Sequence, residues 1–224
     1  METVYVLKTG DRSKAVPTLL AQFNLSDFKG RKIALKANYN SADPFPGSTH
    51  LETLGAIVRE LKNAGAVEIA LAERSGMGLT GKVLSEMGVL KLSEQLGFTV
   101  VILDGTDEKL WTRFSPSPSL HWMNGFWVAK ICTEADKVVQ TCCLKTHRFG
   151  GHFTLSLKNS IGLIAGYGPK DGYNYMGALH SSQHQRLMIA EVNLAYNPDI
   201  IVMDGIEAFV KGGPEDGDRE STHK

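Results

Sequence analysis

Residues 145–166 combine lysine and histidine side chains with an unusually high number of glycines. The polar and flexible positions of this segment are Lys145, His147, Gly150, Gly151, His152, Lys158, Asn159, Gly162 and Gly166. A packed core has no use for so many polar groups. Glycine lets backbone amides approach a ligand, lysine supplies positive charge, and imidazole binds metals and exchanges protons. The segment therefore predicts a site for an anion or for a metal ion.

Side chains capable of chemistry also follow the other predicted strands. They are Lys36 and Asn38, Glu73 and Ser75, Asp104, Lys145 and His147, and Asp204 and Glu207. The carboxyl ends of parallel strands meet at one edge of a sheet, where ligands of open α/β folds bind, so we expect one shared site. Lys36, Lys145, His147 and Asp204 should then line one cleft. The alternative is that these polar residues only end strands.

The residue types indicate how such a site would work. We expect a small carboxylate or phosphate ligand to be bound by Lys36, Lys145 and Lys158. Further contacts are expected from Asn38, Ser75, Asn159 and Gly162. His147, with Asp204 or Glu207, would handle protons or a metal. Lys145 or Lys158 could instead act as a base, although binding a carboxylate demands less of the geometry.

Two pairs of histidines are candidate ligands for a divalent metal. His180 and His184 lie four residues apart on a predicted helix, and His147 and His152 flank a loop that contains two glycines. Residues four apart share one face of a helix. Such a pair without a neighbouring carboxylate is also typical of a solvated or packed face.

Short apolar runs alternate with helical patterns along the chain. The runs predict strands at residues 4–7, 32–37, 67–72, 99–103, 137–144 and 199–203. Helical spacing predicts helices over residues 13–23, 49–64, 79–96 and 179–194. This alternation favours an α/β fold with a mostly parallel sheet and helices on both faces, a three-layer, Rossmann-like arrangement.

The middle of the chain, residues 105–130, interrupts this rhythm. It contains Trp111, Trp122 and Trp127 around the turn-forming residues 115–118. We expect a hairpin or flap whose aromatic side chains seal a secondary core, with a stacking surface for a ligand as the alternative. Residues 1–211 should form one domain, and the polar residues 212–224 should be a disordered tail.

Composition excludes several classes of protein. Lysine plus arginine and aspartate plus glutamate number 24 each, so no net charge favours nucleic acid or an anionic membrane. No apolar run is long enough for a membrane span, and the N-terminus lacks the regions of a signal peptide, which indicates a cytoplasmic protein. Cys132, Cys142 and Cys143 form no C-x-x-C pair, so neither a zinc knuckle nor a self-contained ferredoxin cluster is encoded. A cluster supplied between subunits remains open.

The central segment resembles the family called domain of unknown function 362. The resemblance rests on Leu144-Lys145-Thr146-His147, Thr154, Lys158-Asn159 and Gly162, with support from Lys36, Asn38, Thr49-His50, Gly65, Asp204-Gly205 and Gly212-Gly213-Pro214. It spans roughly residues 30–217. The family implies an α/β fold, and many relatives carry an added ferredoxin-type domain or are described as iron–sulfur proteins.

This chain departs from the family pattern in two ways. Cys142 and Cys143 stand before Leu144, where relatives have Pro-Lys, and relatives continue beyond the Gly-Gly-Pro segment. The chain is therefore expected to be shortened at its C-terminus, and a partner copy in a homo-oligomer could cover an exposed sheet edge. Because no ferredoxin motif is present, the iron–sulfur description does not transfer.

Three classes of function follow from these observations. The first is an enzyme that acts on a small anionic metabolite. Nickel-dependent lactate racemases also place lysine and histidine near glycines in an α/β domain, and this analogy suggests metal-assisted chemistry on a 2-hydroxyacid. The second is a redox or metallocluster accessory protein. The third is a non-catalytic binding or assembly module.

Overall fold

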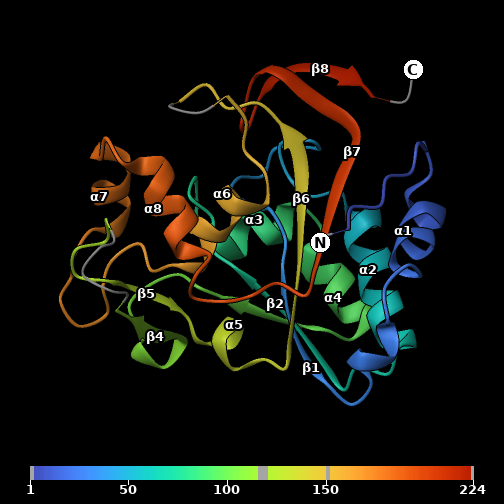
Figure 1. Ribbon diagram of the computed structural model, residues 1–224, viewed down its shortest axis with the longest axis horizontal. Helices are drawn as coiled ribbons and strands as arrows, with labels where there is room; N and C mark the ends of the chain where they lie inside the picture. The colour runs from blue at the N-terminus through green and yellow to red at the C-terminus, as the bar shows by residue number, and fades with distance from the viewer. Residues whose placement is uncertain (1–2, 116–120, 150–151, 223–224) are drawn as a thin grey trace.

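A computed structural model describes residues 3–115, 121–149 and 152–222 of the chain. Its centre is a six-stranded sheet in the order β3-β2-β1-β6-β7-β8 (Figure 1). The strands from β3 to β7 run parallel, and β8 is antiparallel to β7. The predicted α/β class with a mostly parallel sheet is confirmed.

The elements alternate along the chain as the sequence pattern predicts. The strands of the sheet are β1 (Lys32–Lys36), β2 (Glu68–Glu73), β3 (Thr99–Ile102), β6 (Lys137–Lys145), β7 (Ile200–Gly212) and β8 (Gly217–Ser221). The helices are α1 (Arg12–Leu20), α2 (Leu51–Asn63), α3 (Thr80–Glu86), α4 (Val89–Leu96), α5 (Lys130–Glu134), α6 (Ser156–Asn159), α7 (Tyr175–Ser181) and α8 (Gln185–Val192). Single 3-10 turns are η1 (Leu25–Phe28), η2 (Glu108–Leu110) and η3 (Ser160–Leu163).

One face of the sheet packs against α1, α2, α3 and α4. Ile33 and Leu35 of β1 and Ile200 of β7 join Leu54 and Ile57 of α2 in a single buried cluster. Alternate residues of a strand point to opposite faces, so these positions fix the direction of their neighbours. The Lys36 side chain therefore points to the opposite face of the sheet. Asp204, two residues beyond the buried Val202, points to the face that α1–α4 cover.

The opposite face packs against η3, α7 and α8 and against a small hairpin. The hairpin consists of β4 (Trp111–Phe114) and β5 (Phe126–Ala129), which pair in antiparallel fashion. Trp111, Trp122 and Trp127 are all buried, in one cluster with Leu179 and Val192. The contacts support the expected secondary core rather than a stacking surface.

Three expectations for the ends of the chain are wrong. Residues 4–7 form no strand, because they have no strand neighbour among the described residues, and Val4 and Val6 are 83% and 88% exposed. The strand predicted to end at Met203 continues to Gly212, and the tail expected to be disordered contains β8. Pairing with β7 overrides the polar composition of β8, and charged side chains such as Arg219 suit an outer strand.

The helix predicted over residues 179–194 is also wrong in extent. Helix α7 ends at Ser181 and α8 begins at Gln185, so the chain breaks between them. The Ser182 hydroxyl accepts a hydrogen bond from the His184 backbone N–H at 3.0 Å. Serine favours such local turns over helix continuation, which explains the break.

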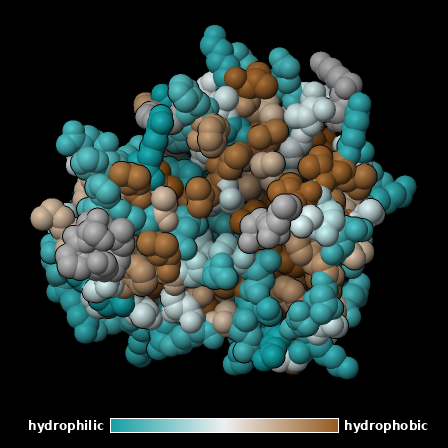
Figure 2. Space-filling model, in the orientation of Figure 1, coloured by the Kyte–Doolittle hydropathy of each residue, from teal (hydrophilic) through white to brown (hydrophobic). Residues whose placement is uncertain are grey.

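The surface around β7 is partly apolar. Ile201 and Met203 of this strand are 46% and 49% exposed, and Figure 2 shows apolar side chains gathered in the upper middle of the face on which β6 and β7 run. In the described part of the chain, no helix has the length and apolarity that crossing a lipid bilayer requires.

Candidate functional site

The carboxyl ends of β1 and β2 hold a buried ion pair between Lys36 and Glu73. The Lys36 ammonium contacts a Glu73 carboxylate oxygen and also donates to the Ala37 carbonyl and, at 3.2 Å, to Asn159 Oδ1. The other Glu73 oxygen accepts the Tyr39 N–H at 2.8 Å. Burial raises the pKa of Glu73, although Lys36 opposes this shift. Lys36 therefore has acceptors inside the protein and holds the strand ends together.

Asn159 and Gly162 support this pair. The Asn159 side chain accepts from Lys36 and donates from Nδ2 to the Thr141 carbonyl at 3.0 Å, which ties α6 to β1 and β6. A Cβ atom on Gly162 would lie 3.0 Å from Cε of Lys36. The glycine therefore makes room for the lysine side chain, a packing role that differs from the predicted contact with a ligand.

Asn38 and Ser75 serve the loops that follow β1 and β2. Asn38 Nδ2 donates to the Gly47 carbonyl at 3.0 Å, and Ser75 Oγ donates to the Tyr39 carbonyl at 2.6 Å. Both side chains are buried. Their hydrogen bonds fold the loops at the sheet edge and do not point to a ligand.

Lys145, at the end of β6, is enclosed by two loops. Its ammonium donates to the Gly47 carbonyl at 2.6 Å and to the Pro214 carbonyl at 2.9 Å. Burial lowers the pKa of Lys145. No carboxylate in the described residues forms an ion pair with this lysine, so its charge is solvated only by carbonyl dipoles.

Lys158 differs from the other lysines of this edge. It lies on α6 and is largely removed from water, yet no described residue accepts a hydrogen bond from its ammonium or forms an ion pair with it. Burial, Arg74 and Lys145 together lower the pKa of Lys158 to about 8. A desolvated ammonium beside other cations is unfavourable unless an anion binds it.

Arg74 lies beside Lys158 and was not among the site residues predicted from the sequence. It follows β2 directly, between Glu73 and Ser75, and its position at the carboxyl end of a strand could have identified it as a candidate. Its Nε donates to the Ile164 carbonyl and its Nη2 to the Ile161 carbonyl, both at 2.9 Å. Carbonyl groups thus hold the guanidinium, and no described carboxylate is paired with it within 4.0 Å.

His147 lies on the loop after β6, near the same cations. Burial lowers the pKa of His147, and the charges of Lys158 and Lys145 lower it further. The ring nitrogen Nδ1 accepts the Phe149 N–H at 3.1 Å, so the neutral imidazole carries its proton on Nε2. We call Lys158, Arg74, Lys145 and His147 the cation cluster.

Asp204 and Glu207 lie away from the cation cluster. The Asp204 carboxylate accepts from Arg12 Nε at 2.7 Å and from the Thr53 hydroxyl, both on the face covered by α1 and α2. Glu207 lies where β7 pairs with β8. The expectation that Asp204 lines one cleft with Lys36 is therefore wrong, because strand alternation sends the two side chains to opposite faces.

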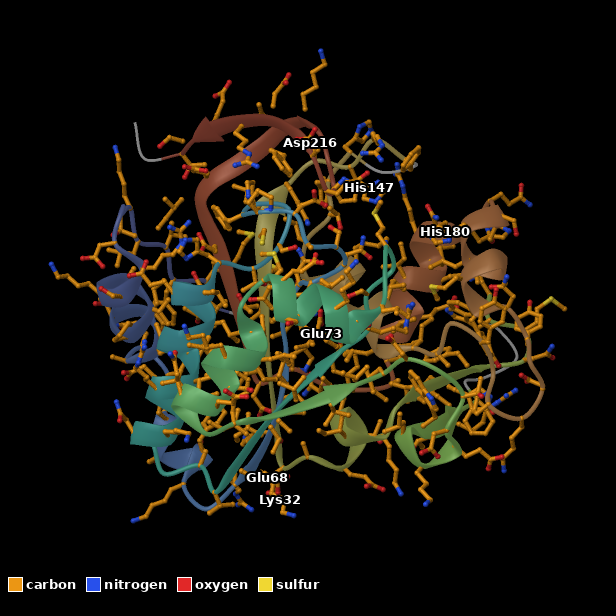
Figure 3. The ribbon with its side chains drawn as sticks, turned by 180° about the vertical axis from the view of Figure 1, so that it is seen from behind. Lys32, Glu68, Glu73, His147, His180 and Asp216 are labelled. Carbon is orange, nitrogen blue, oxygen red and sulfur yellow. The ribbon has the colours of Figure 1, made fainter. Side chains whose placement is uncertain are left out.

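The four candidate metal ligands do not converge. His147 and His152 flank one loop, whereas His180 lies on α7 and His184 precedes α8. Figure 3 labels His147 and His180. The His184 ring contacts the His121 ring, with 4.5 Å between the two centroids. In the described ranges, no group of three or more histidine, cysteine or acidic side chains is placed to hold a metal ion.

The cysteines do not suit an iron–sulfur cluster. All three are buried, and burial raises the pKa of Cys132 and Cys142 to about 12 and that of Cys143 to about 11. Burial thus favours the neutral thiol in each case, and the ligands of one iron–sulfur cluster must also converge on it. Cys143 packs near Asn38 and Cys142 near Ser156, on opposite faces of the sheet.

Two surface hollows lie at opposite ends of the sheet. One, of about 380 Å³, includes Lys32 and Glu68 at the amino ends of β1 and β2 (Figure 3). The other, of about 450 Å³, includes His147 and lies beside the cation cluster. Ligands of open α/β folds bind at the carboxyl ends of strands, so the second hollow has the expected position.

Comparison with known proteins identifies a family and a fold. The family described as "Domain of unknown function (DUF362)" matches residues 33–223. No curated protein matches the chain. Among solved structures, the lactate racemase apoprotein from Thermoanaerobacterium thermosaccharolyticum is similar, with a TM-score of 0.59 and 18% sequence identity over 88% of this chain. The match spans 49% of the racemase chain, and at this identity it shows the shared α/β fold. From the extent of the family match, the chain belongs to the DUF362 family.

Proposed function

We propose that this chain is an enzyme, or the ligand-binding part of one, that takes a small anionic metabolite at the cation cluster. The observation that carries the proposal is Lys158, whose desolvated ammonium has cations beside it and no acceptor among the described residues. A carboxylate or phosphate oxygen would supply that acceptor and neutralise the cluster. Arg74 and Lys145 are already held by carbonyl groups and would add charge without moving.

The same cluster could exchange protons with a bound metabolite. The pKa of Lys158 is about 8, and burial together with the charges of Lys158 and Lys145 lowers the pKa of His147, which favours its neutral, proton-accepting form. Efficient general acids and bases have pKa values near the working pH. We assign anion binding to Lys158 and proton transfer to His147, whose Nδ1 is fixed by the Phe149 N–H.

A small 2-hydroxycarboxylate is the substrate class to test first. The similar fold belongs to a protein named lactate racemase, and lactate is a 2-hydroxycarboxylate. This likeness supports a choice of ligand and supplies no residue roles. Cys142 and Cys143 point to opposite faces of the sheet, which argues against the alternative of an iron–sulfur accessory protein.

Calorimetric titration with lactate, glycerate and inorganic phosphate tests the proposal. We expect Lys158→Met to weaken anion binding by roughly 10- to 100-fold, since a charged hydrogen bond contributes about 1.5–3 kcal/mol. Lys158→Arg should retain part of the affinity. The matched control is Lys82→Met, because Lys82 lies exposed on α3 in an exposed pair with Glu86.

Two results would refute or narrow the proposal. If none of the three anions binds, or if Lys158→Met binds them as well as Lys82→Met does, the cation cluster is not the site. If anions bind but no 2-hydroxycarboxylate is converted, and His147→Gln changes neither property, the chain is a binding module and not an enzyme.

A further inference from the structure

The second hollow has walls from three elements. It is lined by Thr146, His147, Arg148, His152, Arg186, Lys211 and Gly212. Arg186 comes from α8, Lys211 from β7, and the others from the loop after β6 and the end of β7. Its volume of about 450 Å³ is large enough for a small metabolite.

The walls are held in place by close backbone packing. The Thr146 N–H donates to the Phe209 carbonyl at 3.0 Å, and its hydroxyl donates to the Gly212 carbonyl at 3.2 Å. A Cβ atom on Gly213 would lie 2.2 Å from the Thr146 carbonyl oxygen, and Gly213 has φ of 70°. Only glycine allows this turn to approach the end of β6 so closely. The hollow is therefore built by the fold and does not depend on surface side chains alone.

The charge on these walls is positive. Arg148, Arg186 and Lys211 are cations, two histidines add further donors, and no carboxylate of a described residue belongs to the lining. Glu215 offsets Arg148 through an ion pair, and the Gly213 carbonyl and the Phe149 ring also hold that guanidinium. Arg186 and Lys211 add a guanidinium and an ammonium to the same walls, so the hollow suits a multivalent anion.

The hollow and the cation cluster adjoin each other through His147. This residue lines the hollow, and the charges of Lys158 and Lys145 lower its pKa. Lys145 and Thr146 are neighbours in the chain, one in the cluster and one in the wall of the hollow. One ligand with two anionic groups could therefore span both places.

We propose that the hollow is a phosphate subsite, so that the metabolite carries a phosphate group besides the carboxylate bound at Lys158. This inference rests on the proposed function for the position of the carboxylate. A phosphate group carries up to two negative charges on three terminal oxygens, and arginine binds such oxygens in bidentate fashion. The substrate class is a phosphorylated small hydroxy acid.

Glycerate and 3-phosphoglycerate form a matched pair of probes, because they differ only in the phosphate group. Calorimetry on the intact chain should show that 3-phosphoglycerate binds at least ~10-fold more tightly than glycerate, as expected for one charged contact. In the double variant Arg186→Gln/Lys211→Met this ratio should fall to about one. The control Arg59→Gln on α2, away from the hollow, should keep the wild-type ratio, and thermal unfolding will verify that each variant folds.

The outcomes separate this inference from the proposed function. Equal binding of the two probes by the wild type, or an unchanged ratio in the double variant, overturns the phosphate subsite and leaves the carboxylate site standing. A ratio that depends on Lys158 alone also overturns it, because the phosphate then occupies the cation cluster. If the double variant loses the preference while Lys158→Met changes no affinity, the subsite holds and the proposed function fails.

Discussion

Lys36 and Lys158 are two lysines at the same edge of the sheet with opposite surroundings. Lys36 is 2% exposed and its ammonium has Glu73, Asn159 and the Ala37 carbonyl around it. Lys158 lies nearby on α6, with Arg74 and Lys145 as its electrostatic neighbours and no described acceptor. The first arrangement stabilises the fold, whereas the second keeps a charge available. Burial alone therefore does not distinguish the two lysines, whereas their partners do.

The largest expected effect comes from breaking the Lys36 pair. Lys36→Met leaves the Glu73 carboxylate buried without its cation, and we expect a loss of about 3–5 kcal/mol in the free energy of unfolding. Lys158→Met removes a cation that burial and its neighbours disfavour, so it should leave the free energy of unfolding unchanged or raise it. Urea denaturation of both variants measures the contrast.

A double variant provides the control for this prediction. Lys36→Met/Glu73→Gln removes both charges and should be more stable than Lys36→Met alone. Equal losses for Lys36→Met and Lys158→Met would remove the distinction between the two lysines.

The pH dependence of anion binding tests whether the Lys158 ammonium binds the anion. The pKa of Lys158 is about 8, so its ammonium is mostly protonated at pH 7 and loses its charge as the pH rises through 8. An anion binds the charged form, so affinity should fall by up to ~10-fold per pH unit above pH 8. Titrations with lactate between pH 7 and 9.5 measure this slope. A flat profile in this range would mean that Lys158 does not carry the binding.

The smallest effect on binding is expected at Asp204. Its carboxylate holds Arg12 and Thr53 on the opposite face, so Asp204→Asn should lower the free energy of unfolding by about 1–2 kcal/mol. Its anion affinity should stay within about twofold of the wild type, because the residue is remote from Lys158. Calorimetry measures this affinity. A fall as large as that in Lys158→Met would contradict the placement of Asp204 away from the anion site.

The regular part of the fold was predictable because its signals are local. The helical spacing of residues 49–64 and the apolar runs at 32–37, 67–72 and 99–103 correspond closely to α2, β1, β2 and β3. What could not be predicted depends on distant partners. Residues 4–7 have the composition of a strand without a described neighbour, and β8 is polar but pairs with β7.

The candidate site shows the same limit. The sequence indicated which residue types gather at the strand ends, and Lys145, His147 and Lys158 do lie near one another. It could not show that Glu73 neutralises Lys36 or that Asp204 points to the other face. Those facts depend on side-chain direction and on contacts between residues far apart in the chain.

Measuring the pKa of the Lys158 ammonium by NMR on lysine-labelled protein, with and without lactate, shows whether Lys158 holds the anion. We expect a pKa of about 8 in the free protein, because burial and the neighbouring cations lower it. Saturating lactate should raise this value by about one unit or more, because the bound carboxylate favours the charged form. A pKa that lactate leaves unchanged while lactate is bound would contradict the claim that Lys158 holds the anion.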